Sequence, residues 1–154
     1  MAVARDIMTA QVVSVKTDDS VDAVAEVLLR VGHHSVPVVD GAGRVQGMIS
    51  QEDLIDATRK VHLPTVITIL DSFIPLGGYK EFADDLRKST ATTAQQLASV
   101  NLVYAEADED VDSVAEKLSQ SHVHALPVVD HDKRLLGIIT RSDVLRALLS
   151  KTKP

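Results

Sequence analysis

The sequence predicts an α+β fold made of two copies of one β-α-β-β-α unit. Three observations support this: the chain matches itself at a constant shift, each copy alternates strand and helix patterns, and the composition is that of a globular protein. Hydrophobic residues make up 45% and charged residues 25% of the 154 residues, which is ordinary for a globular domain. A chain of this length can bury roughly 70% of its unfolded surface, so its core needs no disulfide or metal.

The internal repeat has a shift of 90 residues and needs no gap. Positions 36–40, Val-Pro-Val-Val-Asp, fall on Leu-Pro-Val-Val-Asp at 126–130. Seventeen of the forty positions in 18–57 are identical at this shift, which is far above chance. Self-similarity at a fixed period indicates a duplicated structural unit.

The first unit begins with a β-rich stretch at 12–15, followed by a helix that starts near Val21. Apolar residues recur there at helical spacing, Asp or Ser of the run 17–20 can cap the free amides, and Gly32 supplies a left-handed stop. The remaining elements are strands at 36–39 and 44–49 with turn residues 40–43 between them, and a helix that begins after Ser50 and runs through Ala57.

The second unit repeats these elements. They are expected at 102–105, 111–121, 126–129, 134–139 and 142–149. Because a lone unit would leave one sheet face bare, we expect the two units to pack sheet against sheet, related by a pseudo-twofold axis, and to share a core.

The sequence divides into a first repeat at 1–58, a helical insertion at 59–93 and a second repeat at 94–154. Within the insertion, 63–76 is typical of an apolar helix and 79–88 of an amphipathic helix, separated by two glycines. The apolar excess predicts that the insertion packs over the module or against a partner copy.

Composition excludes several classes of function. The net charge of −6 and the lack of a long basic cluster argue against binding to nucleic acid or to an anionic membrane. There is no cysteine, and positions 1–10 do not resemble a signal peptide, so a cytoplasmic location is expected. The sequence has no nucleophile elbow, Walker A loop or Rossmann fingerprint, and we do not expect an enzyme. Nor do we expect a metal site, because no cysteine or carboxylate cluster accompanies His33-His34 or His122 and His124.

The strongest local signal is a hydroxyl at the end of a strand, followed three residues later by a carboxylate at a helix start. It occurs as Ser50 with Asp53 and as Thr140 with Asp143. One interpretation is a capping box with Asp in place of the usual Glu or Gln. The other is a ligand site, since helix amides attract phosphate and a carboxylate accepts two hydrogen bonds from a vicinal diol such as ribose. The two interpretations are compatible.

The repeated order of apolar strand, Pro-Val-Val-Asp, turn, and Gly-apolar-apolar-Thr/Ser-x-x-Asp resembles a tandem pair of CBS (cystathionine beta-synthase) domains, also called a Bateman module. The likeness covers 3–58 and 94–150. Positions 5–9, Arg-Asp-Ile-Met-Thr, are similar to the segment that commonly opens such modules, whereas their counterpart at 95–99 has lost the charge and the methionine.

The resemblance implies two clefts between the units that bind AMP, ADP, ATP or S-adenosylmethionine as regulatory ligands. The ribose would contact the Thr/Ser and Asp of one unit, and the base would lie against the early strand and the residues before the Pro of the other. One cleft would then use Thr140, Asp143, Ser14, His33, His34 and Ser35. The other would use Ser50, Asp53, Tyr104, Val123, His124 and Ala125.

The two clefts are not expected to be equivalent. Arg141 can meet a phosphate beside Thr140, whereas Glu52 places negative charge beside Ser50, where like charges repel by roughly 1 kcal/mol or more. We therefore expect a phosphorylated ligand beside Thr140, and beside Ser50 either no ligand or an uncharged adenosine derivative.

The resemblance further implies a stand-alone regulatory module that pairs into a homodimer and passes ligand occupancy to its other protomer or to an effector protein that the sequence does not name. The alternative is a ligand-free structural or protein-interaction module, with the insertion as its docking surface.

Overall fold

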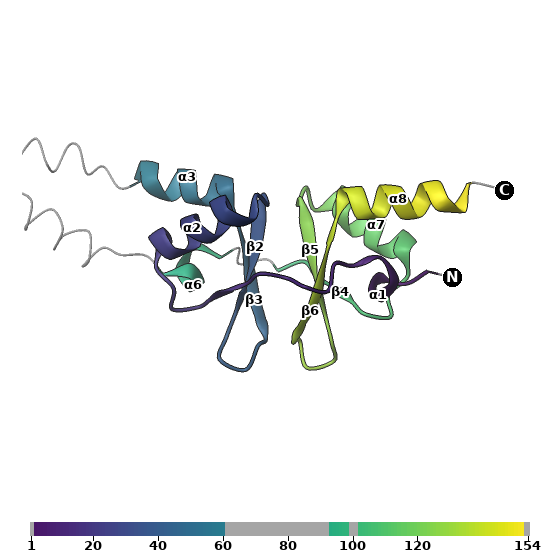
Figure 1. Cartoon of the computed structure of the whole chain (residues 1–154), viewed down its shortest axis with the longest axis horizontal. Coiled ribbons are helices and arrows are strands. Elements are labelled where there is room, and N and C mark those ends of the chain that lie inside the picture. Colours follow the sequence, from purple (N-terminus) through teal and green to yellow (C-terminus); the bar gives the residue numbers. More distant parts are fainter. Residues whose placement is uncertain (1, 61–92, 99–101, 153–154) are drawn as a thin grey trace, which may run out of the picture.

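The computed structural model describes residues 2–60, 93–98 and 102–152. Within these ranges the chain forms two halves, each with a three-stranded sheet and helices on its outer side. The two sheets face each other at the centre, and the helices lie toward the two ends (Figure 1). This arrangement confirms the expected α+β fold of two related units packed sheet to sheet.

The two sheets have the same topology. The first half contains β1 (Val15–Lys16), α2 (Val21–Val31), β2 (Ser35–Val39), β3 (Val45–Ser50) and α3 (Gln51–Lys60). The second contains β4 (Ala105–Glu106), α7 (Val111–Gln120), β5 (Ala125–Val129), β6 (Leu135–Thr140) and α8 (Arg141–Lys151). In each sheet a short strand pairs in parallel with the first strand of an antiparallel hairpin, and the hairpin register shifts at the equivalent position. The duplication therefore extends to the β-bulge.

Local capping explains where the first helix of each half begins. The Ser20 side chain accepts a hydrogen bond from the amide of Ala23, and Gly32 ends α2 with a φ of 68°, a conformation that glycine adopts without a Cβ penalty. In the second half, Asp110 accepts from the amide of Ser113. The expected helix starts and the glycine stop are confirmed.

The first strand of each half is shorter and later than the sequence pattern predicts. β1 covers only Val15 and Lys16, which pair with Val38 and Val39, instead of 12–15. The segment before it crosses from one half to the other and touches a strand only through the isolated bridge between Thr9 and Ile138 of β6. Its apolar residues face a cavity between the halves, described below, so their β-like composition does not produce a ladder.

Each half receives its opening helix from the other sequence repeat. The N-terminal α1 (Ala4–Ile7) packs on the second half, where the amide of Ala4 donates to the carbonyl of Glu109 at 2.7 Å. The corresponding α6 (Ala94–Leu97) packs on the first half, and the amide of Ala94 donates to the carbonyl of Asp19 at 2.8 Å. Figure 1 shows α1 beside α7 and α8, and α6 beside α2. The repeats of the sequence and the halves of the fold are thus not the same sets of residues.

Most of the buried apolar residues in the described ranges form two hydrophobic clusters, one in each half, instead of the single shared core that we expected. One cluster joins Ala94 to Val24, Leu28 and Ile49, and the other joins Ala4 to the second half. The remaining members of that second cluster are Ala105, Ala107, Val114, Leu118, Leu126, Val128, Ile139 and Val144. Each sheet packs its main apolar face on its own helices, including the exchanged one.

The insertion at 59–93, apart from the last residues of α3 and Thr93, lies outside the described residues, and so do both helices expected within it. In the described part of the chain, no helix combines the length and apolar character needed to cross a bilayer.

Candidate functional site

The head of α8 is organised by the hydroxyl and carboxylate that the sequence singled out. The amide of Thr140 donates to Asp143 Oδ2 at 2.8 Å, Thr140 Oγ1 donates to the same oxygen at 2.9 Å, and the amide of Asp143 donates back to Thr140 Oγ1 at 3.3 Å. These contacts form a capping box, so that interpretation is confirmed. The box also fixes both side chains at a helix N-terminus, where free amides and the helix dipole favour an anion.

The head of α3 has the same arrangement. The amide of Ser50 donates to Asp53 Oδ2 at 2.8 Å, and the amide of Asp53 donates to Ser50 Oγ at 3.1 Å. The amide of Gln51 also donates to the carbonyl of His34 at 2.9 Å, which ties this helix head to the segment before β2.

A cavity of about 570 Å³ lies at the head of α8, and we call it the Thr140 cleft. Its volume falls within the range of roughly 300–1,000 Å³ that is typical of small-molecule sites. It brings together six of the residues predicted for this cleft, namely Thr140, Arg141, Asp143, His33, His34 and Ser35. The other lining residues are Thr9, Gln11, Val12, Val13, Gly32, Val36, Pro37, His124, Ala125, Ile138, Ser142 and Arg146.

A smaller cavity of about 150 Å³ lies at the head of α3, and we call it the Ser50 cleft. It brings together five of the residues predicted for it, namely Ser50, Asp53, Val123, His124 and Ala125. The other lining residues are Ser35, Met48, Glu52, Leu102, Val103 and His122. Its volume is below the usual range for a drug-sized ligand, so the two clefts differ in size as well as in sequence.

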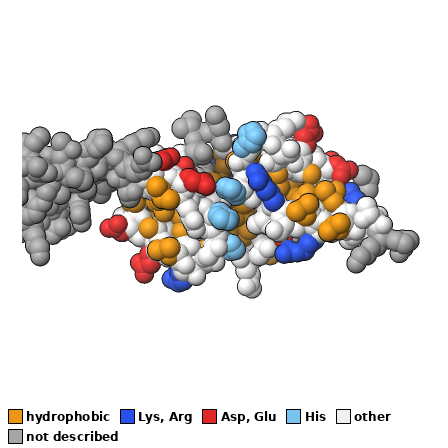
Figure 2. All heavy atoms as spheres, turned by 90° about the horizontal axis from the view of Figure 1, so that it is seen from above, with side chains coloured by type: hydrophobic (Ala, Val, Ile, Leu, Met, Phe, Trp, Pro, Cys, Tyr) orange, Lys and Arg blue, Asp and Glu red, His pale blue; other side chains and the backbone are white. Residues whose placement is uncertain are grey.

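Two histidines separate the clefts. The rings of His34 and His124, which are equivalent in the sequence repeat, stack with centroids 5.2 Å apart and an interplanar angle of 28°. His124 lines both cavities, as do Ser35 and Ala125. Figure 2 shows the histidine side chains in a row across the molecule, between apolar areas of the two halves. The clefts therefore share a wall at the pseudo-twofold axis.

The two clefts also carry opposite charges. Arg141 and Arg146 line the Thr140 cleft, whereas the Ser50 cleft is lined by Glu52, whose Oε1 lies 3.7 Å from His124 Nε2. Arginine recognises phosphate through its planar fork of donors. Arg141 and Glu52, the two residues from which we expected the charge difference, thus each line the predicted cavity.

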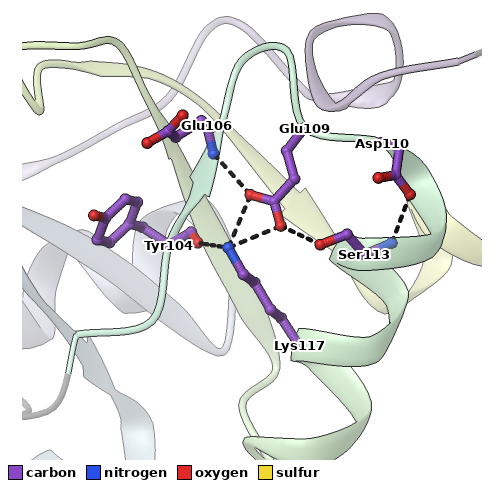
Figure 3. Close-up of polar contacts among 6 residues, drawn as sticks. All are labelled: Tyr104, Glu106, Glu109, Asp110, Ser113 and Lys117. Atoms are coloured by element: carbon purple, nitrogen blue, oxygen red, sulfur yellow. Dashed lines mark hydrogen bonds and ion pairs between the residues drawn. The ribbon is translucent and has the colours of Figure 1, made fainter.

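Two predicted residues, Ser14 and Tyr104, line neither cleft. They are equivalent in the repeat and directly precede the buried first residue of β1 or β4. Figure 3 shows that the Tyr104 carbonyl accepts a hydrogen bond from Lys117, whose Nζ also lies 2.8 Å from Glu109. The Tyr104 ring lies 5.8 Å from this ammonium and 5.7 Å from that of Lys133, so the ring is near these two lysines of the second half.

The Glu109 carboxylate is the centre of that polar network. Burial raises its pKa, but hydrogen bonds from Lys117, Ser113 and the Glu106 amide, together with the charge of Lys117, outweigh burial and lower the pKa below its ordinary value. In the first half, Asp19 accepts an equivalent bond from the amide of Lys16, but apolar residues replace Ser113 and Lys117 there. The network therefore stabilises the second half and takes no part in either cleft.

Sequence reasoning missed several lining residues of the Thr140 cleft, among them Thr9, the run 11–13 and Arg146. Thr9 and the run 11–13 reach it because the N-terminal segment crosses between the halves, which no local pattern reveals. Arg146 could have been predicted from the sequence. It follows Asp143 by three residues on the same helix, and its equivalent in the first repeat is Asp56, of opposite charge.

Among the residues that the structure describes, no group of three or more His, Cys, Asp or Glu side chains is placed to hold a metal ion.

Comparison with known proteins places this arrangement in a family. A model of the CBS domain matches the chain twice, at residues 4–60 and 94–150. The uncharacterized protein MJ1426 of Methanocaldococcus jannaschii is 26% identical over 155 residues, which cover 94% of this chain and 90% of that protein.

Solved structures show the same fold. The crystal structure of CBSX2 in complex with AMP matches with a TM-score of 0.74 and 24% identity, and covers 99% of this chain and all of that chain; CBSX2 is a CBS-pair protein from Arabidopsis thaliana. The cytosolic domain of the Mg²⁺ channel MgtE in complex with ATP matches with a TM-score of 0.66 and 27% identity, and covers 94% of this chain and 48% of that one. Because the CBS model matches both repeats, and these form most of the chain, the protein belongs to the CBS domain family and is a CBS domain pair.

Proposed function

We propose that the protein is a regulatory ligand-sensing module that binds a phosphorylated adenosine compound in the Thr140 cleft. The observation that carries this proposal is the cavity of about 570 Å³ in which Thr140, Asp143 and Arg141 of one repeat face His33, His34 and Ser35 of the other. The matching structures with AMP and with ATP support this ligand class.

The chemistry of the cleft suits such a ligand. Asp143 is held by its cap with a side chain only 12% exposed, in position to accept hydrogen bonds from a ribose diol. Arg141 and the helix dipole favour a phosphate nearby. Apolar lining residues from the crossing segment and from β2, such as Val12, Val13 and Pro37, offer a surface for the base. ADP and ATP are further candidates of the same class, and S-adenosylmethionine is an adenosyl candidate that carries no phosphate.

The shared wall supports a route for transmitting ligand occupancy. A ligand in the Thr140 cleft contacts His34 and His124, and His124 also lines the Ser50 cleft. We propose that occupancy draws the halves together and alters the face seen by an effector protein or by a second copy in a homodimer. The shift can be no larger than the ligand's differential affinity for the two shapes, typically about 1–3 kcal/mol.

The test is calorimetry with AMP, ADP, ATP and S-adenosylmethionine on the wild type, Asp143→Asn and the matched control Asp53→Asn. Asparagine keeps one acceptor for the cap but loses the negative charge. Loss of a hydrogen bond to a charged group costs about 1.5–3 kcal/mol, so Asp143→Asn should weaken AMP binding by roughly 10- to 100-fold. Asp53→Asn should not. Equal affinity in all three proteins would refute the assigned site.

A ligand-free structural or interaction module is the second candidate, because the hydrogen bonds between Thr140 and Asp143 and those between Ser50 and Asp53 are explained as helix caps. Under this hypothesis both Asp→Asn variants lower the melting temperature to a similar extent. No adenosine compound then raises the melting temperature of any of the three proteins.

A further inference from the structure

Arg146 stands out as a residue of the Thr140 cleft that already holds the carboxylate needed for the ribose. Its Nη1 lies 3.1 Å from Asp143 Oδ1. The other carboxylate oxygen, Oδ2, accepts hydrogen bonds from both the amide and the hydroxyl of Thr140. Without ligand, each oxygen of Asp143 is therefore engaged, one by the cap and the other by Arg146.

Arg146 is also well placed on its helix. An α-helix turns about 100° per residue, which puts Arg146 between Ser142 and Asp143 in angle and one turn further along the axis. All three line the Thr140 cleft. The arginine therefore lies on the cavity-facing side of α8, where it can pair either with the Asp143 carboxylate or with a ligand phosphate.

The hold on Asp143 is easily released. The Arg146 side chain is 76% exposed, and exposed ion pairs contribute little to stability because water competes and two long side chains must be ordered. A phosphate offers the guanidinium a bidentate partner. The equivalent position in the first repeat is Asp56, so this exchange of partners is available at only one of the two helix heads.

We propose that Arg146 is a specificity-determining residue that makes the Thr140 cleft select phosphate esters over the free nucleoside. In a phosphorylated ligand, the ribose diol donates a hydrogen bond to Asp143 Oδ1, and the phosphate becomes the new partner of Arg146. A nucleoside without phosphate offers Arg146 no new partner, so any weakening of the contact between Arg146 and Asp143 goes uncompensated. This inference rests on the proposed function, and goes beyond it by naming the residue that links diol recognition to phosphate recognition.

The experiment is calorimetry with AMP and with adenosine on the wild type, Arg146→Gln, Arg146→Lys and Arg44→Gln. Arg44 precedes β3 at the opposite end of the strand from Ser50, so its replacement changes the net charge equally without touching the cleft. The measured quantity is the ratio of the two dissociation constants. The melting temperature of each variant is the control for folding. It should equal that of the wild type, because the replaced side chains of Arg146 and Arg44 are exposed.

We expect the preference for AMP over adenosine to fall at least 10-fold in Arg146→Gln, mainly because AMP binds more weakly. Adenosine affinity should be unchanged or slightly higher, since Asp143 is no longer engaged. Arg146→Lys should lie between, because it keeps the charge and loses the fork, and Arg44→Gln should match the wild type. AMP binding that depends on Asp143 but keeps its wild-type ratio in Arg146→Gln overturns this inference alone. Absence of binding of both compounds to the wild type overturns the proposed function and this inference with it.

Discussion

Gly137→Ala tests whether the N-terminal segment packs over β6 as described. A Cβ at Gly137 would lie 2.6 Å from Met8 Sδ, 2.9 Å from Met8 Cγ and 2.7 Å from the carbonyl oxygen of Thr9. The methionine can rotate away, but the carbonyl cannot, because backbone hydrogen bonds of 2.9 and 3.0 Å join Thr9 to Ile138 in both directions. The substitution must therefore either strain β6 or displace the crossing segment.

The expected cost of Gly137→Ala is about 2–6 kcal/mol. Overpacking of a close contact costs about 1–3 kcal/mol, and loss of the two backbone hydrogen bonds adds about 0.5–1.5 kcal/mol each. Urea unfolding followed by circular dichroism should show a lower midpoint at an unchanged slope. Because Thr9 lines the Thr140 cleft, the AMP-induced rise in melting temperature should shrink as well.

Two further variants make the Gly137 test specific. A Cβ at Gly41 would meet no atom within 4 Å, so Gly41→Ala should change stability by less than about 1 kcal/mol, and in the stabilising direction. Met8→Ala combined with Gly137→Ala removes the side-chain clash but not the one with Thr9, and should regain only part of the loss. If Gly137→Ala unfolded at the wild-type urea concentration, the crossing segment could not lie over β6.

Three other substitutions probe the caps, the polar network and the shared wall. Ser20→Ala removes the cap of α2 and should cost about 1 kcal/mol in chemical unfolding. The folded pKa of Glu109 is lowered, so its contribution to stability is present above the ordinary carboxyl pKa and is lost as the pH falls through the lowered value; Glu109→Gln should destabilise at neutral pH and flatten the acid limb of melting temperature against pH. A wild-type acid limb in Glu109→Gln would exclude this role. His124→Ala should weaken AMP binding severalfold in calorimetry, whereas His131→Ala, in the exposed turn before β6, should not; equal affinities would argue against the shared wall.

Most elements of the fold could be predicted from the sequence because their signals are local and occur twice. Ser20, Gly32 and the paired Pro-Val-Val-Asp segments mark helix ends and hairpins through short-range chemistry. The opening helices α1 and α6 could not be predicted in this way, since each has only four residues. Their exchange between halves depends on contacts about a hundred residues apart along the chain, such as that of Ala4 with Glu109.

The candidate site was predictable to a similar degree, and for the same reason. The helix heads with Thr140 and Ser50 follow from the repeat, and the segments before each proline follow from the resemblance to CBS pairs. Ser14 and Tyr104 do not line the cavities, because other residues of the segments before β1 and β4 do so instead. These are residues 9 and 11–13 in the Thr140 cleft and residues 102 and 103 in the Ser50 cleft. A repeat alignment gives equivalent positions but does not show which neighbour of a strand turns toward a cavity.

The exchanged helices give the halves a physical means of communication. The crossing segment is hydrogen-bonded to β6 at Thr9, lines the Thr140 cleft along 11–13, and continues into β1 of the first half at Val15. A ligand that closes this cleft therefore pulls on a segment anchored in both halves, in addition to the histidine wall. Only residues 10–14 separate the anchor at Thr9 from the anchor at Val15. In the proposed function, this chain path is a route by which occupancy would be coupled to the relative position of the halves, and the size of that coupling is limited by the difference in ligand affinity between the open and closed arrangements.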